Sequence, residues 1–438
     1  MTIDLQIRLK EWEEAYNLNS YLFGSLLVAY KGEILLNNAY GMANLEHKVL
    51  NTSETKFRIG SITKSFTAAA IFQLQEQNKL HIQDPINKYL PDFPNGDRIT
   101  IYNCLTNTSG ITNFTSFSDF WDKTMRLSFS LEEVISSFKS GSLLFDPGTK
   151  FDYSNSGYLI LTAIIEGISG ENYAEYMEGN IFIPLGMYNT GCNNEKEIVP
   201  NLASGYTYFG KPVHATYANP SFPLGAYGLY STVGDLYIWD RAIRANQLVS
   251  EEATKWMLQP FIDSYACGWF RDPVLEKDCY HHFGDISGFV NQMLCFLDDL
   301  TIIFLSNMDI VPVKKLTREI AKIVLNEPYD LPQHLEKVKV QSIDFISGKY
   351  VMKDCPLPLH ITTEENDLFL TVSKDYGVQY KFNLIPINQE YGKIVFKTTM
   401  IDETLEISHS NNEVTSILYT DYFGKQTSLY NSKNIIKN

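Results

Sequence analysis

Two pairs of apolar runs in the first part of the chain have the spacing of β-hairpins. In each pair the two runs are separated by a short turn that is polar or contains glycine, which is the pattern of two antiparallel strands. Between the pairs, the chain from Ser61 to about Leu258 has a largely helical pattern, and Val313 to Leu325 predicts another helix. The two pairs are 22–30 with 33–40, joined by Lys31-Gly32, and 289–297 with 300–306, joined by Asp298-Asp299.

The pattern changes after Asn326. Residues 327–332 have the composition of a linker, and from about Ile343 short runs alternate apolar and polar residues between polar turns. This pattern predicts a small antiparallel barrel. We therefore predict two domains, residues 1–330 and residues 340–438. The expected barrel strands are 368–372, 379–384, 393–397, 405–408 and 414–419.

A length of 438 residues exceeds what one hydrophobic core usually organises, which agrees with two domains. The formal net charge of −15 argues against binding to nucleic acid or to an anionic membrane surface, because both attract basic proteins. We find no apolar run long enough to predict a membrane span. Met1 to Tyr16 has the pattern of an amphipathic helix, not of a signal peptide. We expect a cytoplasmic protein, or one of the cell envelope if an export segment has been removed.

The cysteines are scattered, and neither a Cys-x-x-Cys pair nor a histidine cluster with metal-ligand spacing occurs. We therefore expect free thiols in a reducing compartment, no metal and no cofactor. The six cysteines are Cys104, Cys192, Cys267, Cys279, Cys295 and Cys355.

The candidate chemistry begins at Gly60-Ser61-Ile62-Thr63-Lys64, which precedes a run of small and apolar residues. Positions three apart share one face of a helix, so Ser61 Oγ and Lys64 Nζ can meet at the first turn. A buried amine that is held unprotonated can take the serine proton and activate the hydroxyl as a nucleophile. The structural alternative is a helix N-cap at Ser61 with Lys64 solvated on the first turn.

Two later motifs supply groups that suit the same chemistry. Tyr153 and Asn155 place a phenol and an amide two residues apart, and His282 places an imidazole beside Gly284. Each motif has a structural alternative, because a tyrosine can be a core aromatic and a histidine can be purely structural. If this segment is a strand, His281 points to the opposite face from His282, and we expect it to face solvent.

The order Ser-x-x-Lys, Tyr-x-Asn, His-x-Gly resembles the serine β-lactamase and penicillin-binding-protein superfamily, in its class C-like branch. The resemblance covers roughly residues 10 to 325 and implies an α+β fold, in which the two hairpins join one antiparallel sheet flanked by helices beside a helical subdomain. The predicted barrel resembles the lipocalin-like domain that is appended to some of these hydrolases. Further segments that resemble the branch are 57–61, 80–91, 105–110, 145–149 and 184–187.

The resemblance implies a role for each motif residue. Ser61 would be the nucleophile that forms an acyl-enzyme, and Lys64 would help to deprotonate it. Tyr153 would carry protons to the leaving group and from water. Asn155 would bind the acyl side chain and orient the lysine, and His282 would donate a hydrogen bond toward the tyrosine or the substrate.

The resemblance also implies that the oxyanion hole consists of the backbone N–H groups of Ser61 and of Asp285, the residue after Gly284. Here the chain departs from the family, whose members usually have a small or hydroxylated residue at the position of Phe283 and glycine or serine at that of Asp285. The departure makes the edge of the cleft bulkier and more acidic. A carboxylate there would repel an anionic substrate.

These observations predict a serine hydrolase that acts on amide or ester bonds of D-amino-acid peptides, β-lactams or small esters, with a small molecule or a peptide as its partner. Two alternatives stay open. One is a penicillin-binding sensor that is acylated but turns over poorly, and the other is an inactive scaffold whose barrel binds a partner. The barrel could instead cover the cleft, bind a ligand or mediate a homo-oligomer.

Overall fold

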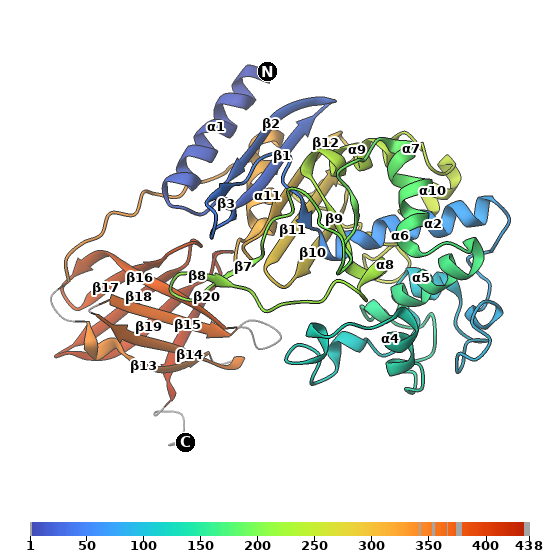
Figure 1. Cartoon of the computed structure of the whole chain (residues 1–438). Helices are drawn as coiled ribbons and strands as arrows, with labels where there is room; N and C mark the ends of the chain where they lie inside the picture. The colour runs from blue at the N-terminus through green and yellow to red at the C-terminus, as the bar shows by residue number, and fades with distance from the viewer. Residues whose placement is uncertain (1, 341–342, 353–354, 366, 374–378, 433–438) are drawn as a thin grey trace. The chain divides into compact units, whose positions relative to one another are not determined.

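The computed structural model describes residues 2–340, 343–352, 355–365, 367–373 and 379–432 (Figure 1). The chain forms two compact units, and neither is continuous in sequence. One consists of Gly24–Ser204 with Thr216–Asn307, and the other of Met1–Phe23 with Gly205–Ala215 and Met308–Asn438. We call the first, which contains the candidate residues Ser61 and Lys64, the catalytic unit, and the second the barrel unit. The predicted domain boundary between residues 330 and 340 stays a prediction.

The catalytic unit contains a five-stranded antiparallel sheet in the order β10-β11-β12-β1-β2. Strands from the two ends of this unit lie side by side, because β1 pairs with β12 from Ser25↔Leu305 to Tyr30↔Leu300. In Figure 1 the blue strands β1 and β2 therefore lie beside the yellow-brown strands β10 to β12. Both predicted hairpins and their single sheet are confirmed. The strands are β1 Gly24–Tyr30, β2 Glu33–Tyr40, β10 Cys279–Ile286, β11 Phe289–Phe296 and β12 Leu300–Ser306.

Helix α2, Thr63–Glu76, passes through the core of this unit and is buried along most of its length. Three consecutive alanines, 68–70, allow neighbours to approach closely, and the Phe66 ring stacks on that of Trp239 at 4.1 Å between centroids. Trp239 belongs to α9, which also contacts β12 and β1. Helix α9 therefore contacts both the sheet and α2. The other helices are α3 Ile101–Leu105, α4 Leu131–Phe138, α5 Asn155–Ser169, α6 Tyr173–Met177, α7 Ile183–Leu185, α8 Leu224–Tyr227, α9 Val233–Arg244 and α10 Glu251–Met257.

Short strands complete the catalytic unit. Two of them pair with each other, β3 Met42–Asn44 with β4 Val49–Leu50. The other three form a small sheet in the order β5-β9-β6. This sheet holds the segment that leads into α2, because its strand β5 ends directly before Ile59 and Gly60. Its strands are β5 Phe57–Arg58, β6 Gly191–Cys192 and β9 Leu229–Ser231.

The barrel unit contains a closed antiparallel barrel in which each strand from β13 to β20 pairs with the next and β20 returns to β13. Alternate side chains such as Leu370, Phe396 and Ile407 point into an apolar core. The predicted antiparallel barrel is confirmed, and its likeness to lipocalins stays a prediction. Its strands are β13 Gly348–Met352, β14 Cys355–Glu364, β15 Asp367–Ser373, β16 Gln379–Glu390, β17 Lys393–Thr398, β18 Thr404–Ser410, β19 Glu413–Thr420 and β20 Gln426–Asn431.

The barrel unit also contains two long helices and a hairpin. Helix α1 contacts α11, and Asn326, with φ of 62°, ends α11 in a left-handed conformation. The hairpin contacts β16 of the barrel, where Tyr208 stacks on Phe382. Both helices match the sequence prediction. These elements are α1 Thr2–Leu18, α11 Val313–Leu325, β7 Tyr206–Tyr208 and β8 Pro212–His214.

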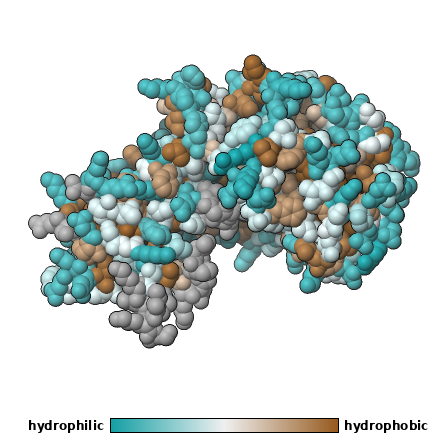
Figure 2. Space-filling model, turned by 60° about the horizontal axis from the view of Figure 1, so that its bottom comes forward, coloured by the Kyte–Doolittle hydropathy of each residue, from teal (hydrophilic) through white to brown (hydrophobic). Residues whose placement is uncertain are grey.

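None of the helices in the described part of the chain has both the length and the apolar character needed to cross a lipid bilayer. On the face shown in Figure 2, hydrophobic residues are interspersed with hydrophilic ones. Five of the six cysteines are free thiols, as predicted: Cys104, Cys192, Cys267, Cys279 and Cys295. The side chain of Cys355 lies outside the described residues.

Candidate active site

Ser61 lies in a single 3-10 turn, Gly60–Ile62, that leads directly into α2. The sequence predicted that Ser61 lies in the first turn of the α-helix. This is wrong, because α2 begins at Thr63 and Ser61 lies in the 3-10 turn before it. The predicted contact is nevertheless present: Lys64 Nζ lies 3.1 Å from Ser61 Oγ. The alternative of a solvated lysine is also wrong, since the side chain is 0% exposed.

The Lys64 amine has two further partners in addition to Ser61. It donates hydrogen bonds to Asn155 Oδ1 and to the carbonyl oxygen of Ala226, both at 2.7 Å. Burial lowers the pKa of the ammonium group well below its ordinary value. A neutral amine can satisfy both acceptors with its two N–H bonds and direct its lone pair at the serine O–H. This geometry suits a general base.

Tyr153 and Asn155 reach the amine from the start of α5. The Tyr153 ring lies with its centroid 4.8 Å from the lysine Nζ. Asn155 donates through Nδ2 to Thr115 Oγ1 at 3.2 Å, which leaves its Oδ1 for the lysine. Asn107 accepts hydrogen bonds from the backbone of residues 152 and 154 and so positions this segment. The segment 105–110, predicted only by resemblance, thus contacts the tyrosine motif.

His282 lies on β10, with its side chain 1% exposed. Its Nδ1 lies 2.7 Å from the carbonyl oxygen of Phe283, and a carbonyl can only accept, so Nδ1 carries a hydrogen. Its Nε2 lies 3.4 Å from the hydroxyl of Tyr265. The His282 ring is 6.3 Å from that of Tyr153, between centroids. The histidine therefore lies near the tyrosine, and its role as a hydrogen-bond donor to the tyrosine or the substrate stays a prediction.

His281 lies on the opposite face of β10, as the alternation predicts, but it does not face open solvent. Its Nε2 is 2.8 Å from Asp272 Oδ1, and its side chain is 19% exposed. The histidine lowers the pKa of the Asp272 carboxyl. The expectation of a solvent-facing His281 is wrong. Strand alternation predicts which face of β10 carries the side chain, but not that the segment containing Asp272 packs against that face.

Two glycines let the backbone of β10 approach Ser61. A Cβ on Gly284 would lie 1.9 Å from the carbonyl oxygen of Ile59 and 3.4 Å from Ser61 N. A Cβ on Gly60, whose φ is +56°, would lie 2.7 Å from Asp285 N. Only glycine fits at either position. The backbone N–H groups of Ser61 and Asp285 are therefore brought to neighbouring places, as an oxyanion hole requires.

A cavity of about 50 Å³ opens at Ser61. Asn155 and Asp285 reach it beside the serine, so three of the predicted site residues line one space. Apart from these polar groups its walls are largely apolar. The apolar side chains that line it include Phe120, Trp121, Met125, Phe222 and Tyr227.

Three contributions were not found from the sequence. The carbonyl of Ala226 accepts from the lysine, Tyr265 contacts His282, and Asn291 Nδ2 donates to the carbonyl oxygen of Arg58 at 3.0 Å. Of these three, only the Ala226 carbonyl could have been suspected from the sequence, because a glycine, Gly225, precedes it. A Cβ there would lie 2.4 Å from Thr162 Oγ1.

The sequence model of the beta-lactamase family matches residues 22–324, a range that contains every residue of this site. The chain belongs to the beta-lactamase family. PbpX of Bacillus subtilis (strain 168), which is named as a penicillin-binding protein, is 33% identical to this family member over 268 residues. The alignment spans 61% of this chain and 65% of PbpX, slightly less than two thirds of that relative. Penicillin-binding protein 4* of the same strain is 28% identical over 400 residues, which cover 84% of this chain and 86% of that protein.

Solved structures extend the fold comparison to the barrel. The octameric penicillin-binding protein homologue from Pyrococcus abyssi has a TM-score of 0.66 at 23% identity and covers 97% of this chain and 99% of its own. The D-amino acid amidase from Ochrobactrum anthropi SV3 has a TM-score of 0.65 at 22% identity, over 74% of this beta-lactamase family member and 99% of its own chain. These likenesses establish the fold.

Replacement of the buried amine tests its part in the site. We expect Lys64→Met to slow acylation of Ser61 by about 10²- to 10⁴-fold, as loss of a general base does.

The same variant tests the pKa of the amine through the stability of the fold. The unfolded chain keeps the Lys64 proton up to about pH 10, whereas the folded protein loses it at lower pH. Folding therefore releases a proton in this interval, so the free energy of unfolding of the wild type relative to Lys64→Met should rise with pH. Denaturant titrations across pH and stopped-flow acylation measure both effects. Lys79→Met, at an exposed position, is the control, and equal pH slopes in wild type and Lys64→Met would contradict the assignment.

Replacement of Gly284 tests the backbone approach. We expect Gly284→Ala to lower kcat by about 10²- to 10³-fold, because its Cβ would push β10 away from the 3-10 turn and misplace one oxyanion donor. Gly167→Ala, in α5 with no atom within 4 Å of the added Cβ, is the matched control. Circular dichroism checks that both variants fold, and Asn291→Ala tests the same approach with a smaller change. Full activity of a folded Gly284→Ala would refute the oxyanion assignment.

Proposed function

We propose that this protein is a serine hydrolase in which Ser61 forms an acyl-enzyme with an amide or ester substrate. The observation that carries the proposal is the position of the Lys64 amine, which is fully buried, lies 3.1 Å from Ser61 Oγ and is held by two oxygen acceptors. Burial lowers its pKa, which favours the neutral amine that a proton acceptor has to be.

In the proposed acylation, Ser61 Oγ attacks the carbonyl carbon of the substrate while its proton passes to Lys64 Nζ. The negative charge on the carbonyl oxygen is stabilised by the N–H groups of Ser61 and Asp285. Tyr153, whose ring lies against the amine, passes the proton to the leaving nitrogen or oxygen. In deacylation, water attacks the ester, its proton leaves through Tyr153, and Ser61 regains its hydrogen.

We propose D-amino-acid peptides, β-lactams or small esters as the substrate class. The cavity beside Ser61 supports a small, partly apolar acyl group, because aromatic side chains line it and Asn155 offers an amide at its edge. The names of PbpX and penicillin-binding protein 4* support the β-lactam member of this class. An oligomer formed through the barrel is part of the proposal, since a homologue of the same fold is described as octameric.

Asp285 supports a preference within this class. Its side chain is exposed, and it lines the same cavity as the nucleophile. A carboxylate in this place attracts a cationic group on the substrate and repels an anionic one. We therefore propose that substrates with a free amino group next to the scissile carbonyl are favoured over substrates that carry a carboxylate there.

Intact mass after incubation with benzylpenicillin tests the acyl-enzyme. We expect the wild type to gain the full mass of the drug, because opening of the β-lactam ring releases no leaving group, and Ser61→Ala to gain nothing. Ser65→Ala, which removes a buried hydroxyl four residues away, is the matched control. A lasting adduct supports the alternative of a penicillin-binding protein with slow turnover, and loss of drug without a lasting adduct supports a lactamase.

If no adduct forms and no drug is lost, the same assay is repeated with D-alanine amide and with p-nitrophenyl acetate. If the wild type hydrolyses D-alanine amide and Ser61→Ala does not, the substrates are D-amino-acid amides or peptides. If the same holds for p-nitrophenyl acetate, the substrates are esters. If all three substrate classes give no reaction that depends on Ser61, the proposed mechanism is wrong and the inactive scaffold is favoured.

Matched anilides of D-alanine test the role of Asp285. The free amine, the N-acetyl form and the N-succinyl form are cationic, neutral and anionic beside the same scissile bond. We expect Asp285→Asn to shift the ratio of kcat/KM between the cationic and anionic substrates by about tenfold toward the anionic one. Asp278→Asn, an exposed aspartate just before β10, should not shift it. An unchanged ratio in Asp285→Asn would show that the carboxylate does not select substrates.

A further inference from the structure

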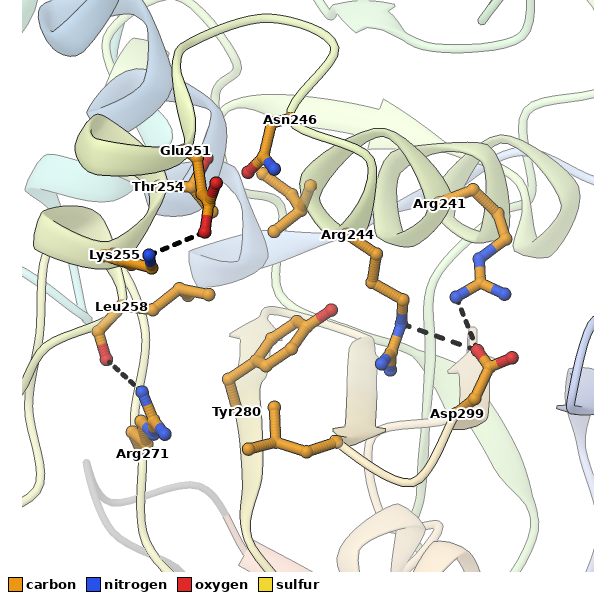
Figure 3. Close-up of a pocket in the computed structure, with 12 residues that line it drawn as sticks. Arg241, Arg244, Asn246, Glu251, Thr254, Lys255, Leu258, Arg271, Tyr280 and Asp299 are labelled. Atoms are coloured by element: carbon orange, nitrogen blue, oxygen red, sulfur yellow. Dashed lines mark hydrogen bonds and ion pairs between the residues drawn. The ribbon is translucent and has the colours of Figure 1, made fainter.

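A second pocket of the catalytic unit, of about 500 Å³, lies between α9, α10, strand β10 and the turn from β11 to β12. Tyr280 forms its floor, with Arg241 and Arg244 on one side of the ring and Lys255 and Arg271 on the other (Figure 3). Such a volume is typical of a site for a small molecule. Four cationic side chains meet here although the whole chain has a formal charge of −15.

The arginines of α9 form a rigid wall. Arg244 Nε donates to both oxygens of the buried Asp240, at 2.9 and 3.0 Å, and its Nη2 donates to the carbonyl oxygen of Phe296 at 2.9 Å. Arg241 pairs with Asp299 at 2.6 Å. Tyr280 is fixed by its own hydrogen bond to Asp240 at 2.6 Å. Carboxylates therefore compensate the charge on this side, and the tyrosine ring is held in place.

On the other side of the Tyr280 ring, the guanidinium of Arg271 has no carboxylate partner in the described part of the chain. Lys255 pairs with Glu251 on the exposed surface of α10. Arg271 makes one long hydrogen bond, from Nη1 to the carbonyl oxygen of Leu258 at 3.4 Å. No carboxylate of the described residues lies within ion-pair distance of this guanidinium. One positive charge thus stays available at the pocket, on a group whose planar fork can bind a carboxylate or a phosphate with two hydrogen bonds.

A buried hydroxyl gives an independent indication of a ligand. Thr254 lines the pocket, is 8% exposed, and its Oγ1 has no hydrogen-bond partner among the described residues. Buried polar groups in native proteins are rarely left without a partner, because the loss of hydration then has no compensation. A ligand oxygen in the pocket would supply one. Ile243, Leu258 and Leu297 offer apolar surface beside it.

We infer that this pocket binds a small organic anion, with its carboxylate or phosphate head at Arg271 and Thr254 and its apolar body against Tyr280. The inference does not depend on the proposed hydrolase activity. None of the residues that line this pocket lines the cavity at Ser61.

Calorimetric titration of the full chain at constant ionic strength tests the site with phenylacetate, phenyl phosphate and the neutral benzyl alcohol. We expect saturable binding of at least one of the two anions, with Kd below about 1 mM. If phenylacetate binds more tightly, the site takes a carboxylate head, and if phenyl phosphate does, it takes a phosphate head. Arg271→Gln should weaken it about tenfold and Arg271→Lys less, because a charged donor is retained. Thr254→Val should weaken it about threefold, since one hydrogen bond is lost.

Lys88→Gln is the matched control for Lys255→Gln, because each removes an exposed lysine paired with an acidic residue four positions earlier. Binding should fall in Lys255→Gln, because this change leaves the Glu251 carboxylate at the pocket without its cationic partner, and it should not fall in Lys88→Gln. Ser61→Ala should bind as the wild type does. The inference is overturned if neither anion binds at several times this concentration, if Arg271→Gln binds as tightly as the wild type, or if benzyl alcohol binds as tightly as the anions.

Discussion

The burial of one amine is the constraint on which the rest of the site depends. An ammonium group without a carboxylate partner is costly to bury, so the interior favours the neutral form of Lys64. The two oxygens that hold it come from α5 and α8, and the serine comes from the turn before α2. Three separate segments must therefore pack closely around one nitrogen. The small residues of α2 and Gly225 of α8 are what allow this packing.

The second half of the site uses the edge of a sheet. An edge strand normally presents unpaired backbone groups that a protein has to protect. Here β10 is the edge strand, and its outer side approaches the turn that carries Ser61. The approach is possible because Gly60 and Gly284 face each other. A backbone donor that would otherwise be exposed at the sheet edge is thus placed beside Ser61.

Local charge differs between the two cavities of the catalytic unit in a way that the net charge does not reveal. Asp285 places a carboxylate at the cavity of Ser61, whereas Arg271 places an uncompensated guanidinium at the second pocket. Electrostatic interactions at these distances are governed by the nearest groups, because solvent and salt screen the distant ones. An acidic protein can therefore favour a cation at one site and an anion at another.

Local patterns in the sequence were enough to predict many of the elements and to select the candidate residues. Alternation and turn residues predicted both hairpins and four of the eight barrel strands, β15, β17, β18 and β19, to within a few residues, because burial of one strand face repeats at every second position. The prediction for β16 ended six residues too early, and β13, β14 and β20 were not specified. The spacing of Ser61 and Lys64 predicted their contact, which depends only on three residues of local backbone. Tertiary structure alone decided that Ala226 receives the lysine, that His281 pairs with Asp272 and that Tyr265 contacts His282. These contacts join residues far apart in the chain, and no local pattern specifies which distant segment will pack against which.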